Sequence, residues 1–151
     1  CIQGGHAVFI TGSGISGAIA KMLAFRLKQL GVEVEAYHIP EGVARSYRPG
    51  DVLFAISSSG TTKMTLTQVE QARGVEGVTI ISIVSEPLSK IAQLSDIIIV
   101  LPRKPIKNAD FFLLNTFFEI AATIIVNELI LPIKQKLGVT EEQMGKEHQF
   151  Y

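Results

Sequence analysis

The sequence lacks the residues that mark several classes of protein. It has one cysteine, Cys1, so no disulfide can form within the chain, and a reducing cytoplasm is the expected compartment. Its three histidines do not occur with cysteines at metal-ligand spacing, so no metal site is expected. The 14 basic side chains are matched by 14 acidic ones, which argues against nucleic acid or an anionic membrane as the main partner.

Apolar residues, in contrast, are abundant and make up 47% of the 151 positions. This composition is typical of one globular domain, and we expect a single domain over residues 1–151. The chain begins at Cys1 rather than at a methionine, and its first strand-like run follows within a few residues. We therefore expect that N-terminal sequence is missing, and the sequence leaves open whether it forms a single helix or a larger helical domain.

Short apolar runs alternate with helix-like stretches along most of the chain. The runs are rich in Val and Ile and apolar on both faces, as in the strands of a covered parallel sheet. Two intervening helices are expected to end at Gly31 and Gly74. The alternation predicts an open, doubly wound α/β sheet, whose ligand site lies outside the carboxyl ends of the strands. The expected strands are residues 7–11, 32–38, 52–56, 78–84 and 97–100.

Two hydroxyl-rich loops, residues 11–16 and 57–62, follow the first and third expected strands. A loop of this kind directs backbone N–H groups and the positive end of a helix dipole at one point, which suits phosphate. A single loop would be interpreted as ordinary capping hydroxyls, but two at one sheet edge indicate a phosphate held from both sides. Ser58 is expected to contribute mainly its backbone amide. The candidate phosphate ligands are Ser16, Ser57, Ser58, Ser59 and Thr62.

The first loop also fits a dinucleotide-binding fingerprint. Gly12, Gly14 and Gly17 satisfy G-x-G-x-x-G, and Glu33 and Glu35 follow about 20 residues on, where such folds place a ribose-binding acid. Both acids, however, alternate with valines inside the second expected strand, whereas the ribose-binding acid should end it. The second loop also has no role in that fold, so the dinucleotide interpretation is the weaker one.

The most apolar stretch of the chain, residues 110–131, is long enough to suggest a transmembrane helix. Glu119 and Asn127 are among the polar residues that interrupt it, and charges at mid-membrane depth cost several kcal/mol, so we do not expect a membrane span. We expect a helix buried against both the sheet and another subunit, kinked or ended by Pro132. Residues 140–143 fit a capping box that opens a final helix.

The two loops resemble those of the sugar isomerase (SIS) domain family. The patterns are Gly12-x-Gly14-x-Ser16 and Ser57-x-Ser59-Gly60-x-Thr62, on the first and third strands of a five-stranded, flavodoxin-like sheet. The likeness covers nearly the whole chain. The tail, residues 138–144 followed by His148, is most similar to the 6-phospho-3-hexuloisomerases, which interconvert a 3-hexulose 6-phosphate and fructose 6-phosphate. Ile15 departs from that subfamily, which usually has Arg at this position.

The resemblance implies a phosphorylated sugar as partner, no cofactor, and a homo-oligomer, either a dimer or a tetramer. Isomerisation requires removal of a proton next to a carbonyl, and a carboxylate can shuttle that proton through an enediol. Glu119 matches the family's proposed base. His148 could relay protons, and because the tail is short and terminal we expect it to reach the site of a neighbouring subunit. Gly14, His38 and Glu41 are candidates for the sugar pocket.

Each of these assignments has a plainer alternative. Asn115, Glu119, Thr123 and Asn127 recur every four residues and could form a polar, solvated stripe, while His148 could be an exposed tail residue. The whole chain could also be a phosphosugar-binding regulatory module that performs no catalysis.

Overall fold

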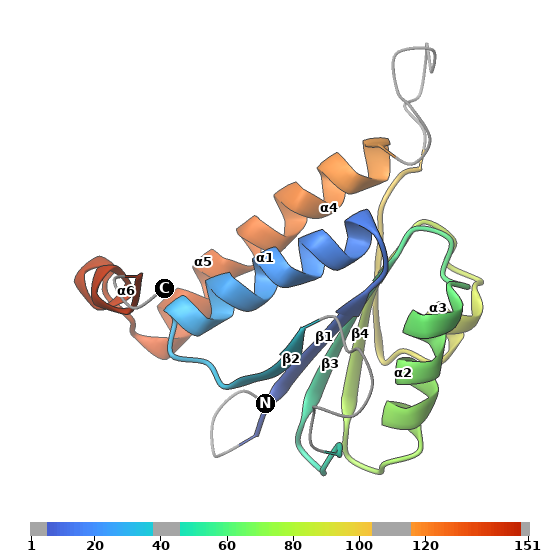
Figure 1. The fold of residues 1–151 in the computed structure, drawn as a ribbon, viewed down its shortest axis with the longest axis horizontal. Helices are drawn as coiled ribbons and strands as arrows, with labels where there is room; N and C mark the ends of the chain where they lie inside the picture. Colours follow the sequence, from blue (N-terminus) through green and yellow to red (C-terminus); the bar gives the residue numbers. More distant parts are fainter. Residues whose placement is uncertain (1–5, 38–45, 104–115, 149–151) are drawn as a thin grey trace.

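The computed structural model describes residues 6–37, 46–103 and 116–148, and within them it contains one sheet of five parallel strands. The strand order is β2-β1-β3-β4-β5, which is the flavodoxin-like order (Figure 1). The predicted fold class is therefore confirmed. The strands are β1 Val8–Gly12, β2 Val34–Tyr37, β3 Val52–Ser57, β4 Thr79–Val84 and β5 Ile97–Val100.

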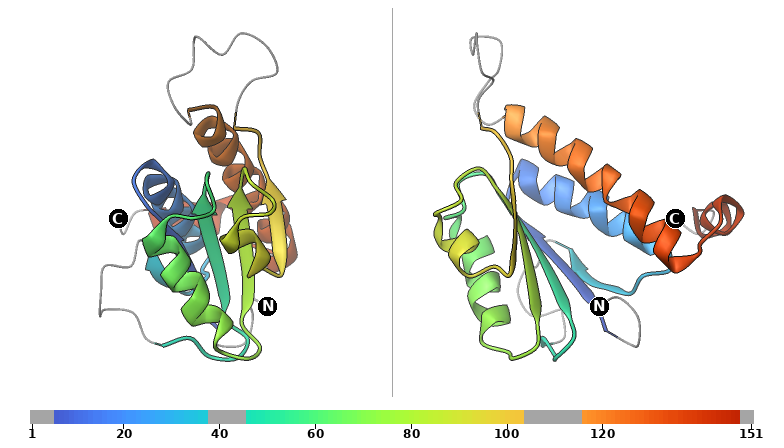
Figure 2. Two further views of the ribbon diagram at one scale, coloured as in Figure 1. Left: turned by 90° about the vertical axis from the view of Figure 1, so that its right-hand side faces the viewer. Right: turned by 180° about the vertical axis from the view of Figure 1, so that it is seen from behind.

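Helices cover both faces of this sheet. One face carries α1 and α4, and the other carries α2 and α3, as the two further views also show (Figure 2). The one-turn α3 was not expected from the sequence. The helices are α1 Ile15–Gln29, α2 Lys63–Arg73, α3 Lys90–Gln93, α4 Thr116–Glu128, α5 Ile130–Leu137 and α6 Glu141–His148.

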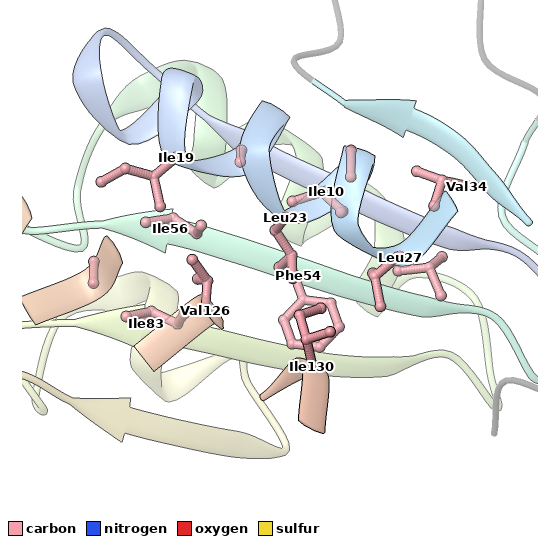
Figure 3. Packing of buried hydrophobic residues seen from close by; sticks show 14 of the residues in the cluster. Ile10, Ile19, Leu23, Leu27, Val34, Phe54, Ile56, Ile83, Val126 and Ile130 are labelled. Atoms are coloured by element: carbon pink, nitrogen blue, oxygen red, sulfur yellow. The ribbon is translucent and has the colours of Figure 1, made fainter. Parts of the chain in front are cut away.

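The central strands are apolar on both faces because each face is packed under a helical layer. In β3, Phe54 and Ile56 belong to the cluster under α1 and α4, whereas Leu53 and Ala55 belong to the cluster under α2 and α3. Figure 3 shows the first cluster, in which Leu23 of α1 lies close to the sheet residues. This two-sided burial explains the continuous Val- and Ile-rich runs.

A buried carboxylate fixes the sheet at the edge opposite the hydroxyl-rich loops. Asp51, which is fully buried, accepts hydrogen bonds from the backbone N–H groups of Ala7 at 2.9 Å and Arg48 at 2.7 Å. The bond to Ala7 joins the start of β1 to the start of β3, and the bond to Arg48 closes the turn before β3. Tyr47 lies nearby, where burial and then the Asp51 charge raise its pKa well above the usual value, and its hydroxyl bonds Gln68 Oε1 of α2 at 3.3 Å.

The expectation that all five strands are covered was wrong for β5 in the described part of the chain. Ile97 and Val100 are each 50% exposed and Ile98 is 42% exposed. This strand lies at the edge of the sheet with β4 as its neighbour, and the single turn of α3 is too short to cover it.

The apolar helix expected over residues 110–131 is described from Thr116 onward, and residues 110–115 lie outside the described residues. Its interruption lies at Leu129 rather than at Pro132, and α5 continues through the proline. Pro132 has no N–H to donate to the carbonyl of Glu128, four residues earlier, so the helical bonding breaks before the proline. Pro132 itself lies in the first turn of α5, where no intrahelical N–H bond is required.

The segment Thr116–Leu137 is long and apolar enough to cross a membrane by length and composition alone. Core helices of globular proteins also meet that criterion, and one face of α4 does pack inside this molecule. Phe118, Ala122 and Val126 are buried against α1 and the sheet. The opposite face of α4 is exposed, as Ile120 and Ile124 show.

The capping box predicted at the start of the last helix is confirmed. The N–H of Gln143 donates to Thr140 Oγ1 at 3.2 Å, and the N–H of Thr140 donates to Gln143 Oε1 at 2.8 Å. Two backbone donors at the start of α6 are satisfied reciprocally in this way.

Candidate functional site

The two hydroxyl-rich loops meet at the point where the strand order reverses. The chain crosses from β1 to β2 on one side, and β3 then adds on the other side of β1, so α1 and α2 leave the sheet on opposite faces (Figure 1). In open α/β sheets, the crevice at the carboxyl ends of such strands is the usual ligand site. The fold therefore brings both predicted loops to one edge.

The β1–α1 loop is shaped by two glycines. A Cβ atom on Gly12 would lie 2.6 Å from the carbonyl oxygen of Ser16, so no side chain fits there. Gly14 has φ +60°, a conformation that favours glycine. It occupies the N-cap position before α1 and offers no side chain to cap the helix. Ser16, half-buried, lies in the first turn of α1.

Ser13, in the same loop, was given no role from the sequence. Its Oγ is buried and has no hydrogen-bond partner among the described residues. An unsatisfied buried hydroxyl costs about 1–3 kcal/mol, so it is a candidate for a group that gains a partner when ligand binds. The loop's composition could have drawn attention to Ser13, but its missing partner is visible only in three dimensions.

The β3–α2 loop is held by hydrogen bonds around Ser57. The side chain of Ser57 is almost fully buried; its Oγ lies 3.1 Å from Thr62 Oγ1 and accepts the N–H of Gly60 at 3.2 Å. Gly60 has φ +63°, and a Cβ atom there would lie 1.9 Å from Ser89 Oγ. The N–H of Gly60 also donates to the carbonyl of Ser57 at 3.1 Å, so this amide is satisfied within the loop.

The side chains of Ser58 and Ser59 differ in direction. Ser58 Oγ lies 3.4 Å from Ser85 Oγ, and its carbonyl accepts the N–H of Ser85 at 3.0 Å, so Ser58 ties the loop to the segment after β4. Ser59, half-buried, accepts the N–H of Thr61 at 3.3 Å. That Ser58 contributes its backbone amide to phosphate binding stays a prediction.

The starts of α1 and α2 carry uncompensated positive charge. Neither helix has a side-chain cap hydrogen bond, and neither has an acidic residue in its first turn. First-turn N–H groups have no intrahelical partner and add to the positive end of the helix dipole. The short α3, in contrast, is capped by Ser89, whose side chain accepts the N–H of Ala92. The two helix starts at the crevice are thus suited to an anion.

Glu119 lies in the first turn of α4 and is half-buried. The start of α4 is at the same end of the molecule as the start of α1 in both figures (Figures 1 and 2). No hydrogen bond or ion pair involves Glu119 within residues 6–37, 46–103 and 116–148.

The polar stripe that continues from Glu119 along α4 is not uniformly solvated. Asn127, two turns on, is half-buried, donates to the carbonyl of Thr123 at 2.8 Å and contacts Met22 Sδ at 3.8 Å.

The remaining predicted residues are not brought to this edge by the described structure. His148 ends α6, which lies at the far end of α1, and a helix of 15 residues is about 22 Å long (Figure 1). Within one chain, α6 is therefore remote from the loops. His38 and Glu41 lie outside the described residues, as does Asn115.

A cleft of about 270 Å³ lies elsewhere, between α1, the α4–α5 segment and α6. It is lined by Arg26, Asn127, Ile130, Leu131, Lys134, Glu141 and Met144. Because these residues belong to the end of the molecule away from the loops, the cleft is not part of the candidate site. In the part of the chain that the structure describes, no three His, Cys, Asp or Glu side chains gather as a metal site would require.

The sequence matches the family model of the SIS domain over residues 2–131. A protein of Methanocaldococcus jannaschii named 3-hexulose-6-phosphate isomerase is 33% identical over 141 residues, covering 93% of this chain and 74% of its own. A crystal structure of a hypothetical protein from Methanococcus jannaschii, for which the function of a 3-hexulose-6-phosphate isomerase was inferred, has a TM-score of 0.80 and 32% identity over 94% of this chain and 76% of its own. The Vibrio vulnificus NanR protein complexed with ManNAc-6P shares the fold, with a TM-score of 0.75 and 20% identity over 96% of this chain and 55% of its own.

Proposed function

Because the chain belongs to the SIS domain family, we propose that it is a phosphosugar isomerase of the 6-phospho-3-hexuloisomerase type, formed as a single domain over residues 1–151. The observation that carries the proposal is the pair of loops at the β1/β3 switch point, each leading into a helix start with neither cap nor acid. A sugar phosphate supplies the anion that this arrangement favours.

The phosphate is bound between Ser16 and the loop of residues 57–62. Hydroxyl donors come from Ser16 and Thr62, and from Ser59 when it turns from Thr61 to the ligand. Ser57 orients Thr62 from behind, because its own side chain is buried and bonded to Thr62 Oγ1. Ser13 adds a further hydroxyl from the opposite loop.

Glu119 is the proposed base. Its carboxylate takes the proton from the carbon next to the carbonyl while the carbonyl oxygen gains a proton, which forms an enediol. Delivery of a proton to the former carbonyl carbon, with loss of a proton from the neighbouring hydroxyl, moves the carbonyl by one position. Support comes from the location of Glu119 at the start of α4, at the same end as the loops.

The sugar ring is proposed to contact Gly14, His38 and Glu41. His148 is proposed to relay protons in the site of a neighbouring subunit, because α6 lies too far from the loops of its own chain.

Deuterium exchange tests the proposed reaction directly. A panel of ketose and aldose phosphates in heavy water is expected to gain deuterium next to the carbonyl, because the base exchanges its proton with solvent. Fructose 6-phosphate should exchange and equilibrate with its 3-keto isomer, whereas unphosphorylated fructose should not. Binding of fructose 6-phosphate without exchange or product would instead favour the alternative, a regulatory module that binds phosphosugars without catalysis.

We also propose that the chain assembles through the exposed face of α4. Ile120 and Ile124 of α4 are 47% and 56% exposed, and Leu131, in the adjoining α5, is 55% exposed. Light scattering at micromolar concentration is expected to give at least a dimer, and Ile124→Glu should shift the mass to the monomer. Leu88→Glu is the control, since Leu88 is 84% exposed but lies far from α4 in the chain. A monomeric wild-type protein would contradict the proposal.

A further inference from the structure

Lys63 is the first residue of α2 and directly follows the phosphate-binding loop. We infer that Lys63 is a binding residue for the substrate phosphate, supplying the cationic charge that the loops themselves lack. This inference rests on the function proposed above, and it adds a residue that the sequence analysis did not consider. Lys63 is exposed and therefore accessible to ligand.

The position of Lys63 is electrostatically unfavourable in the absence of an anion. A cation at a helix N-terminus is repelled by the positive end of the helix dipole. The first turn of α2 contains no acidic residue, and Thr62 provides no side-chain cap because its hydroxyl is bonded to Ser57. A bound phosphate would offset the repulsion of the lysine by the helix dipole, because it attracts the ammonium group. It would also accept hydrogen bonds from the uncapped N–H groups at the start of α2.

The direction and surroundings of Lys63 support this role. Side chains on a helix lean towards its N-terminus, which for Lys63 is the loop of residues 57–62. Two other cations pair with carboxylates, Arg73 with Asp96 at 2.8 Å and Lys134 with Glu141. Within the described ranges, no ion pair or hydrogen bond involves the ammonium group of Lys63.

Among the described residues, the start of α1 provides no equivalent charge. Ile15 is the first residue of α1, as Lys63 is of α2, and it is 59% exposed. The two helix starts thus present one apolar and one cationic side chain at matched positions. The phosphate should therefore receive its charge compensation from the α2 side.

The first test compares Lys63→Gln with Lys90→Gln by titration with fructose 6-phosphate. Lys90 is a matched control because it is also exposed and first in a helix, but α3 is already capped by Ser89 and follows β4 rather than β3. Lys63→Gln should weaken binding about tenfold and reduce its salt dependence, because a charged contact is lost. Lys90→Gln should bind as the wild type does, and Lys63→Arg should retain most of the affinity.

The second test uses the sign of the stability change. Without ligand, Lys63→Gln should raise Tm by about 1–3 °C, because repulsion from the helix dipole is removed. With saturating fructose 6-phosphate, the same variant should show a smaller ligand-induced rise than the wild type. Replacing a lysine with a purely structural role would not both raise the ligand-free Tm and reduce the rise that the ligand induces.

The outcomes separate this inference from the proposed function. Wild-type affinity of Lys63→Gln for fructose 6-phosphate, or a fall in its ligand-free Tm, overturns the role of Lys63 and leaves the proposed function standing. Failure of the wild type to bind any phosphosugar in the panel overturns the proposed function itself, and the role of Lys63 with it.

Discussion

Glu119→Gln is expected to lower turnover of the ketose phosphate by about 10²–10⁴-fold while leaving phosphosugar affinity nearly unchanged. Glutamine keeps the shape and polarity of the side chain but cannot accept the substrate proton. Because Glu119 lies on α4 and not in either loop, phosphate binding should not depend on it. Steady-state turnover and a fructose 6-phosphate titration on the same preparation measure the two effects, and deuterium exchange should fall in parallel with turnover.

Thr123→Ala is the matched control for this prediction, since Thr123 lies one turn along the same stripe and is also half-buried. Its carbonyl already accepts from Asn127, and that backbone bond survives the substitution. We expect little change in turnover. Equal losses in both variants would indicate that the stripe stabilises the fold or the assembly. In that case Glu119 would be an acid favoured by the dipole of α4, with no role in proton transfer.

Much of the fold could be predicted from local patterns. The five strands lie within a few residues of the apolar runs, and the Thr140 capping box forms as its sequence indicates. The one-turn α3 could not be recognised, because four residues carry no helical periodicity. The exposure of β5 could not be recognised either, since an apolar run does not reveal whether a helix or a second chain covers it.

The candidate site could be predicted as two loops, but not in its internal arrangement. Hydroxyls and glycines after strands are visible in the sequence, and parallel strands bring them to one edge. The different directions of Ser57 and Ser58 depend on partners such as Ser85, which is 27 residues away from Ser58. The distance between α6 and the loops likewise depends on how the helices pack. The sequence alone therefore could not show that His148 lies far from the loops of its own chain.

Ser57 and Thr62 share a hydrogen bond, and this makes their double replacement a sharper test of the phosphate site than either single one. When only one of the two residues is replaced, the hydroxyl of the other can rotate and bond the phosphate, which would hide part of the loss. Ser57→Ala with Thr62→Ala removes both, and a hydrogen bond to a charged group is worth about 1.5–3 kcal/mol. Because only Thr62 of this pair bonds the phosphate directly, fructose 6-phosphate affinity is expected to fall by about 10–150-fold by isothermal titration.

The loop backbone should survive this double replacement, because the N–H of Gly60 also donates to the carbonyl of Ser57 at 3.1 Å and needs no side chain there. Ser58→Ala is the matched control, since its hydroxyl faces Ser85 and not the crevice between the helix starts. It should bind fructose 6-phosphate within about twofold of the wild type. Unchanged affinity in the double variant would remove the β3–α2 loop from the phosphate site. Equal losses in the double variant and in Ser58→Ala would mean that the loop acts through its shape rather than through the hydroxyls of Ser57 and Thr62.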